Sequence, residues 1–203
     1  MSIRPAMEVA SQGNTARKRA QAGLSLIVPC YNEADNLPAF HARLCETAEK
    51  LRATRGLRVE VVYIDDGSRD NTYAVACDLP AIGLDVQVLS LSRNFGKEAA
   101  LMAGLQHARN GALLFMDGDG QHPPATLPGM LDLAERYDMV VGSRGGRGGS
   151  RHRNIANQVY SRFASYVSGR HIPDLTSGFR LVRADVVKDL VWLLPNTFSY
   201  PTT

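Results

Sequence analysis

The stretch Ala112-Leu113-Leu114-Phe115-Met116-Asp117-Gly118-Asp119-Gly120-Gln121 places two carboxylates, one residue apart, directly after a short apolar run. Such a run is typical of a buried strand. Open α/β sheets bind their ligands beyond the carboxyl ends of the strands, where these two acids would lie. Carboxylate oxygens suit Mg²⁺ or Mn²⁺, which usually take substrate phosphates as further ligands. The stretch therefore predicts a metal-bound diphosphate, although in isolation an ordinary Asp-Gly turn explains it equally well.

Two other apolar runs also end in polar residues. Val61–Ile64 leads into Asp65-Asp66-Gly67-Ser68, and Leu24–Val28 leads into Pro29-Cys30-Tyr31-Asn32-Glu33. In a parallel sheet these strand ends meet at one edge, so we expect their polar groups to surround one site. The alternative for the two aspartates is a helix-capping turn in which one of them serves only the backbone. The alternative for the tyrosine is simple packing.

Strand-like runs alternate with helical patterns, which predicts an α/β domain with a mostly parallel central sheet flanked by helices. The expected strands are residues 24–28, 59–64, 86–91, 112–116 and 139–142. The expected helices are residues 37–51, capped by Asn36 and stopped at Gly56; a short helix from Asp70-Asn71-Thr72 to Leu79; and residues 98–107, 127–136 and 155–167.

Length and composition indicate one globular domain. The chain has 203 residues, of which 44% are hydrophobic and 21% charged, as in soluble proteins. Residues 1–23 lack an apolar segment and are predicted to be a flexible N-terminal tail. Cys30, Cys45 and Cys77 lack metal-ligand spacing, which favours reduced thiols in the cytoplasm. No apolar run approaches the roughly 20 residues that span a bilayer, and the abrupt end at Thr203 suggests a longer native chain.

The net charge and the absence of several motifs exclude some classes of function. A net charge of +3 is too small to indicate nucleic-acid binding. The chain has no G-x-G-x-x-G after the first strand, no G-x-x-x-x-G-K-[ST] and no G-x-S-x-G, so phosphates would be held by a metal and by cationic side chains. Four arginines lie among glycines between Arg144 and Arg153. This segment is either a solvated loop or a mobile clamp for an anionic ligand.

Five segments together resemble family 2 glycosyltransferases of the GT-A fold. They are Val28–Glu33, Asp65–Ser68, Arg93–Ala100, Asp117–Pro124 and Asp174–Arg180. Within that family they look most like the polyprenyl-phosphate glycosyltransferases, the group that includes dolichyl-phosphate mannose synthase. The resemblance covers residues 24–203 and implies a GT-A catalytic domain that is truncated at its C-terminus. It also implies inverting transfer of a sugar from a UDP- or GDP-sugar to undecaprenyl or dolichyl phosphate, at the cytoplasmic face of a membrane.

The resemblance and the positions of the charged residues give a candidate set for each role. The metal ligands for Mg²⁺ or Mn²⁺ would be Asp117, Asp119 and Gln121. The donor nucleotide would contact Pro29, Tyr31, Glu33, Asp65, Asp66, Lys97, Asp117 and Gly118. The catalytic set would be Asp119, Arg144, Asp174 and Arg180, and the acceptor phosphate would meet Arg144, Arg151, Arg153 and Ser177. The segment Gly145–Gly149 has the composition of a lid.

Two other functions remain open at this stage. Transfer to a saccharide hydroxyl would need a general base, for which Asp174 is the candidate. The absence of Q-x-x-R-W, with Trp192 as the single tryptophan, argues against the processive polysaccharide synthases. A nucleotide-sugar-binding domain without turnover is the other alternative. Neither the donor base nor the donor sugar is determined by these residues.

Overall fold

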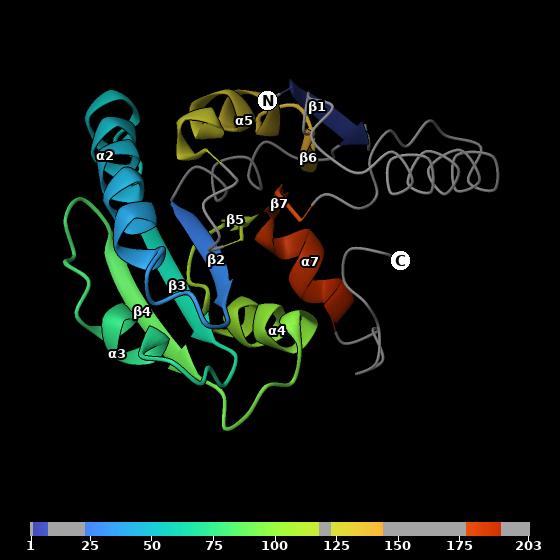
Figure 1. The fold of residues 1–203 in the computed structure, drawn as a ribbon. Coiled ribbons are helices and arrows are strands. Elements are labelled where there is room, and N and C mark those ends of the chain that lie inside the picture. The colour runs from blue at the N-terminus through green and yellow to red at the C-terminus, as the bar shows by residue number, and fades with distance from the viewer. Residues whose placement is uncertain (1, 8–22, 118–122, 144–177, 192–203) are drawn as a thin grey trace, which may run out of the picture.

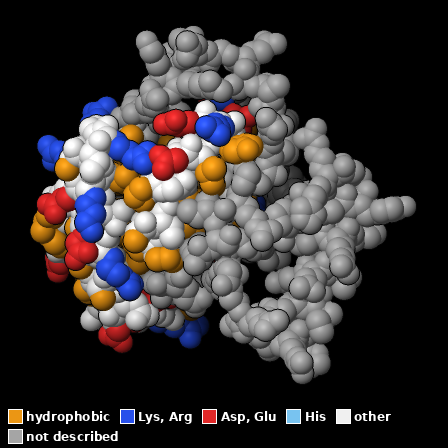
Figure 2. Space-filling model, turned by 90° about the horizontal axis from the view of Figure 1, so that it is seen from above, with side chains coloured by type: hydrophobic (Ala, Val, Ile, Leu, Met, Phe, Trp, Pro, Cys, Tyr) orange, Lys and Arg blue, Asp and Glu red, His pale blue; other side chains and the backbone are white. Residues whose placement is uncertain are grey.

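A computed structural model describes residues 2–7, 23–117, 123–143 and 178–191. Within these ranges one seven-stranded sheet, with the order β1-β6-β7-β5-β2-β3-β4, forms the centre of the molecule. Helices cover both of its faces (Figure 1). On the face seen in Figure 2, acidic and basic side chains of the described residues are interspersed with small hydrophobic areas, in keeping with the small net charge.

Five strands run in the same direction, which confirms the mostly parallel sheet. They are β2 (Leu24–Cys30), β3 (Val59–Asp65), β4 (Asp85–Ser90), β5 (Ala112–Phe115) and β6 (Met139–Ser143). The parallel pairs are β2–β3, β2–β5 and β3–β4. Strand β7 (Arg180–Arg183) is antiparallel to both β5 and β6, so β5 and β6 share a direction. The carboxyl ends of the five strands therefore lie at one edge of the sheet, together with the start of β7.

The core consists of two apolar layers, one on each face of the sheet. Side chains alternate along a strand, so Leu26 and Val28 of β2 belong to one layer and Ile27 to the other. Helix α2 (Leu37–Arg55) packs in the first layer, and α4 (Lys97–His107) packs in the second. The first layer also holds residues of α3 (Thr72–Cys77) and α5 (Leu127–Ala134), and the second also holds residues of α7 (Ala184–Val191). The 3₁₀ turn η1 (Pro124–Thr126) contacts α2 and α5. Because both faces of the sheet are covered, both sets of alternating side chains are buried, which explains why the central strands are almost entirely apolar.

Helix α2 begins and ends close to the predicted positions, but its start is held differently. Gly56 ends the helix in the left-handed conformation, with φ 61°, and its amide donates to the carbonyl of Arg52 at 3.0 Å, as helix-terminal glycines do. The side chain of Asn36, which we expected to cap the helix, makes no capping bond. It donates instead to Glu33 Oε2 at 2.8 Å. The predicted side-chain cap is therefore wrong, because an acidic acceptor lies within reach on the preceding turn.

Besides the short 3₁₀ turn η1, two strands and one α-helix of the described residues were not predicted. Strand β7 lies between β5 and β6, and α7 follows it directly. Strand β1 (Ser2–Met7) pairs antiparallel with β6 at the edge of the sheet, so the predicted flexible tail is wrong for these six residues. An edge strand needs backbone pairing on one side only and tolerates a residue such as Pro5. Residues 8–22 and the helix expected at 155–167 lie outside the described residues.

Candidate functional site

A pocket of about 340 Å³ opens at the carboxyl edge of the parallel strands. Its lining residues are Pro29, Cys30, Tyr31, Glu33, Asp66, Asn94, Gly96, Lys97 and Asp117. The structure thus brings together predicted donor-binding residues from the ends of β2, β3 and β5 and from the start of α4. Asp65 is absent from this lining, and Gly118 lies outside the described residues.

Asp66 fixes one end of the pocket through hydrogen bonds to the backbone. Its side chain is buried, and its two carboxylate oxygens accept from the amides of Phe95 at 2.8 Å and Gly96 at 3.0 Å. These bonds hold the loop between β4 and α4 against the end of β3. Gly67 has φ 62°, and a Cβ added there would lie 2.3 Å from the carbonyl carbon of Arg93. The close approach of the two loops therefore requires glycine at this position.

Asp65 has a structural role in the turn after β3. It is the last residue of that strand, and its Oδ1 accepts from the amide of Ser68 at 3.2 Å. Its Oδ2 accepts from Ser90 Oγ at 3.4 Å. The turn-forming alternative considered for this pair of aspartates therefore describes the contacts of Asp65, whereas Asp66 is the one that lines the pocket.

The rim of the pocket is held by hydrogen bonds between the loops after β2 and β3. Asn32 has φ 55°, a left-handed conformation that asparagine tolerates. Its amide donates to Ser68 Oγ at 3.0 Å, and its Oδ1 accepts from the amide of Arg69 at 2.9 Å. The amide of Glu33 donates to Thr72 Oγ1 at 2.8 Å. These reciprocal bonds arrange the two loops before any ligand binds.

An ion pair forms the other end of the pocket. Lys97 is the first residue of α4, and its Nζ contacts Asp117 Oδ1 just beyond β5. A Cβ added at Gly178 would lie 3.1 Å from this Nζ and 3.5 Å from Asp117 Oδ2, so the chain before β7 passes close to the pair. In the described part of the chain no three His, Cys, Asp or Glu residues converge to hold a metal. The other predicted ligands, Asp119 and Gln121, lie outside it.

Of the remaining candidate site residues, Arg180 lies within the part of the chain that the structure describes, and the others lie outside it. Arg180 is partly buried and opens β7, where it pairs in register with Phe115, two residues before Asp117. It therefore lies at the pocket edge of the sheet, although it is not among the lining residues. The candidates outside the described residues are Arg144, Arg151, Arg153, Asp174 and Ser177, together with the predicted lid Gly145–Gly149.

Three lining residues were missing from the candidate set: Cys30, Asn94 and Gly96. All three belong to segments that carry the family resemblance, which is the signal that could have identified them. Burial raises the pKa of the Cys30 thiol far above its usual range, and its Sγ lies 3.6 Å from the carbonyl oxygen of Val28. Because the thiolate is the reactive form of cysteine, we assign Cys30 a packing role and not a nucleophilic one.

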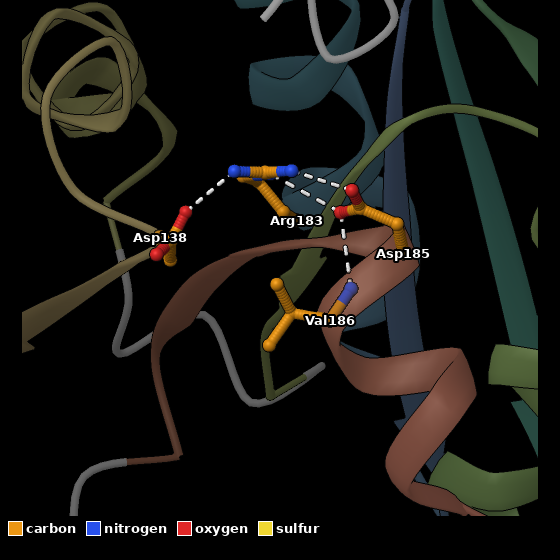
Figure 3. Close-up of polar contacts among 4 residues, drawn as sticks. All are labelled: Asp138, Arg183, Asp185 and Val186. Carbon is orange, nitrogen blue, oxygen red and sulfur yellow. Dashed lines mark hydrogen bonds and ion pairs between the residues drawn. The ribbon is translucent and has the colours of Figure 1, made fainter. Parts of the chain in front are cut away.

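A second polar group, the Arg183 cluster, consists of Asp138, Arg183, Asp185 and Val186 (Figure 3). Arg183 donates to Asp138 Oδ1 at 2.6 Å and, through two nitrogens, to both oxygens of Asp185 at 3.1 and 2.5 Å. Asp185 also accepts from the amide of Val186 at 3.0 Å. The hydrogen bonds from Arg183 lower the pKa of the Asp185 carboxyl. The cluster joins the end of β7 and the start of α7 to the turn before β6.

Comparisons with known proteins all point to glycosyl transferases. Residues 25–191 match the family described as glycosyl transferase family 2. The chain is 34% identical over 170 residues to a prophage bactoprenol glucosyl transferase homolog of Escherichia coli (strain K12), covering 82% of this chain and 54% of that protein. It is 30% identical over 187 residues to an undecaprenyl-phosphate 4-deoxy-4-formamido-L-arabinose transferase of Klebsiella pneumoniae (strain 342), covering 87% and 56%. The chain therefore spans about half the length of these curated relatives.

A solved structure supports the fold. Glucosyl-3-phosphoglycerate synthase from Mycobacterium tuberculosis, crystallised with Mn²⁺ and UDP-glucose, superposes with a TM-score of 0.58 at 18% identity, covering 88% of this chain and 62% of that one. The expected α/β fold of the GT-A type is confirmed. No helix in the ranges that the structure describes has the length and hydropathy required to span a membrane.

Proposed function

Because the chain belongs to glycosyl transferase family 2, we propose that it transfers a sugar from a nucleotide-sugar donor to a polyprenyl phosphate, with inversion at the anomeric carbon. One observation carries the proposal: a single pocket at the carboxyl edge of the sheet holds Asp66 at one end and the Lys97–Asp117 pair at the other. The names of the two curated relatives supply the class of acceptor.

Asp66 and Tyr31 are the proposed contacts of the nucleoside. Each oxygen of the Asp66 carboxylate accepts one backbone amide, and each keeps a lone pair for another donor. A single imino N–H, as in uracil, needs only one of them. Guanine, with two donors on one edge, could use both oxygens, so the choice of base rests on the ligand of the structurally similar synthase, and we propose a UDP-sugar and not a GDP-sugar. Tyr31 lines the pocket with 40% of its surface exposed, which leaves its ring available for stacking.

The diphosphate is proposed to lie at the other end. Carboxylates fit Mg²⁺ or Mn²⁺, and the side chain of Asp117 already holds a cation, the ammonium of Lys97. When bound there with Asp119 and Gln121, the metal would neutralise the charge that develops on the departing nucleoside diphosphate. Lys97 adds a second positive charge from the start of α4.

The acceptor determines which groups must activate it. A lipid phosphate is ionised near neutral pH, so it requires positioning and no general base. Arg144, Arg151, Arg153, Arg180 and Ser177 are the proposed contacts for it, because arginine binds phosphate through paired N–H donors. A polyprenyl chain lies in the bilayer, which leads us to propose a peripheral position at the cytoplasmic membrane face. Asp174 would act as a base only if the acceptor were a hydroxyl.

Binding and turnover should be measured separately on the 203-residue chain. Calorimetric titration with UDP and with GDP, each with and without Mn²⁺, should show Mn²⁺-dependent binding of UDP. Transfer of labelled sugar from UDP-glucose to undecaprenyl phosphate in detergent should fall roughly 100-fold in Asp117→Ala, because the leaving group loses its charge stabilisation. Asp35→Ala, an exposed aspartate, is the matched control.

Three results would change the proposal. Binding of GDP in place of UDP would overturn the choice of base. Mn²⁺-dependent UDP binding with no transfer to any acceptor would favour the non-catalytic nucleotide-sugar-binding domain. Transfer that is unaffected in Asp117→Ala would contradict the role of this end of the pocket.

A further inference from the structure

The ion pair between Lys97 and Asp117 joins two residues with different proposed ligands, the diphosphate and the metal. We propose that Lys97 is a counter-ion that pairs with Asp117 when no metal is bound. When a divalent cation binds Asp117, the side chain of Lys97 moves and pairs with the donor diphosphate instead. A single lysine would thus couple metal binding to nucleotide binding. This inference rests on the proposed function, since it requires a metal and a diphosphate in this pocket.

The exposure of the pair permits such an exchange. The side chain of Lys97 is 39% exposed and that of Asp117 is 24% exposed. Ion pairs in contact with water are weak, because solvent screens their attraction. The pair also lines the same pocket as Asp66, so a ligand entering the pocket reaches it directly.

The chain before β7 passes close to the ammonium of Lys97. A Cβ at Gly178 would approach Lys97 Nζ to 3.1 Å, which is inside ordinary van der Waals contact. The segment that contains Gly178 is held in place, because the carbonyl of Phe179 accepts from the amide of Gly142 at 2.9 Å. The ammonium therefore lies near Asp117, just beyond β5, and near Gly178, just before β7.

The anchoring of Lys97 allows its side chain to move while its backbone stays fixed. The preceding residue, Gly96, donates its amide to Asp66 Oδ2 at 3.0 Å, and Lys97 begins an 11-residue helix. Beyond this fixed backbone a flexible four-carbon stem carries a compact point charge. A divalent cation and an ammonium on one carboxylate repel each other, so binding of the cation favours departure of the lysine, and the incoming diphosphate is the nearest proposed anion.

The exchange predicts effects of opposite sign in one variant. Lys97→Met should bind Mn²⁺ alone about threefold to fivefold more tightly, because the competing cation is gone. The same variant should bind UDP at saturating Mn²⁺ about tenfold more weakly, because a charge-assisted hydrogen bond to the diphosphate is lost. A lysine that only stabilised the fold would change both affinities in the same direction.

The experiment measures free Mn²⁺ by electron paramagnetic resonance during titration of the 203-residue chain, and UDP binding by calorimetry. The variants are Lys97→Met, Lys97→Arg and Lys50→Met, the last on the exposed face of α2, where it changes the net charge equally. Lys97→Arg keeps the charge and should therefore retain more of the UDP affinity than Lys97→Met. Thermal unfolding of each variant shows whether it is folded.

An unchanged or weaker affinity of Lys97→Met for Mn²⁺ would overturn the exchange, as would an equal gain in Lys50→Met. The proposed function fails in a different way, through the absence of sugar transfer in a chain that binds both Mn²⁺ and UDP. If the unmodified chain binds no Mn²⁺, the metal site of the proposed function and the exchange are both wrong.

Discussion

At one end of the pocket the carboxylate of Asp66 is buried and accepts hydrogen bonds from two backbone amides, whereas at the other end Asp117 is partly exposed and contacts the side chain of Lys97. A backbone partner can move only if its loop moves, but a lysine can change partners by rotating its stem. One end of the pocket is therefore fixed, and we propose that it binds the nucleoside, whereas the other end is adaptable and is proposed to bind the metal and the diphosphate.

The largest expected difference between the two ends is in stability. Asp66→Ala would leave the partly buried amides of Phe95 and Gly96 without their charged acceptor, which should lower the free energy of unfolding by about 1–3 kcal/mol. Asp117→Ala removes a partly exposed ion pair and should cost less than about 1 kcal/mol, after allowance for solvent screening. Urea unfolding of both variants, with Asp35→Ala as control, measures the difference. Equal losses would contradict the distinction between a fixed and an adaptable end.

Glu60, a buried carboxylate at the opposite edge of the sheet, can show whether a loss of stability by itself lowers the affinity for UDP. Glu60, near the start of β3, accepts from Ser25 Oγ at 2.5 Å and the amide of Arg109 at 2.7 Å through Oε1, and from Gln87 Nε2 at 3.0 Å through Oε2. Glu60→Gln turns one oxygen into a donor and should lower the free energy of unfolding by about 1–2 kcal/mol.

The affinity of Glu60→Gln for UDP should stay unchanged, because this residue lies at the edge of the sheet away from the pocket. Urea unfolding and UDP calorimetry on the same preparation provide the two readings. A matched loss of stability and affinity in this variant would show that UDP affinity follows the general stability of the sheet and not the local groups of the pocket.

The smallest expected effect concerns the Arg183 cluster and depends on pH. Arg183 holds the pKa of Asp185 below its usual value, so the pair stabilises the folded state above the unfolded pKa, and this contribution is lost as the pH falls through the folded pKa. The side chain of Asp185 is 56% exposed, and its contribution should be below about 1 kcal/mol.

Asp185→Asn should therefore be slightly less stable than the unmodified chain at pH 7, and the two should converge as the pH falls below about 4. Thermal unfolding between pH 3 and pH 7 measures this, with the exposed Asp78→Asn as control. A stability difference that persists unchanged at low pH would show that the side chain acts through packing and not through its charge.

Much of the parallel half of the molecule could be predicted from local patterns. Strands β2, β3 and β5 are mostly apolar runs, and helix α2 follows its apolar spacing up to the stop at Gly56. These signals are local because one strand or one helix turn involves only neighbouring residues. The same reasoning placed the pocket residues at one edge, since strands separated by helices run parallel.

The antiparallel part was not predictable in the same way. Strand β7 has four residues and begins and ends with arginine, so its sequence lacks the apolar run of a central strand. Strand β1 has no such run either. Both form because neighbouring strands offer unpaired backbone groups, and a short segment gains hydrogen bonds by pairing with them. The tail prediction failed because β1 pairs with the distant strand β6, whereas the capping prediction failed because Glu33, three residues away, binds the side chain of Asn36.

The sequence by itself determined the family, the parallel strands with their helices, and most of the residues at the mouth of the pocket. The tertiary structure alone decided that Asp65 holds a turn while Asp66 faces the pocket, and that Lys97 meets Asp117. The first follows from geometry, because successive residues at a strand end point in different directions. The second depends on how α4 packs against the sheet, which brings together side chains from two separate segments and which no local pattern records.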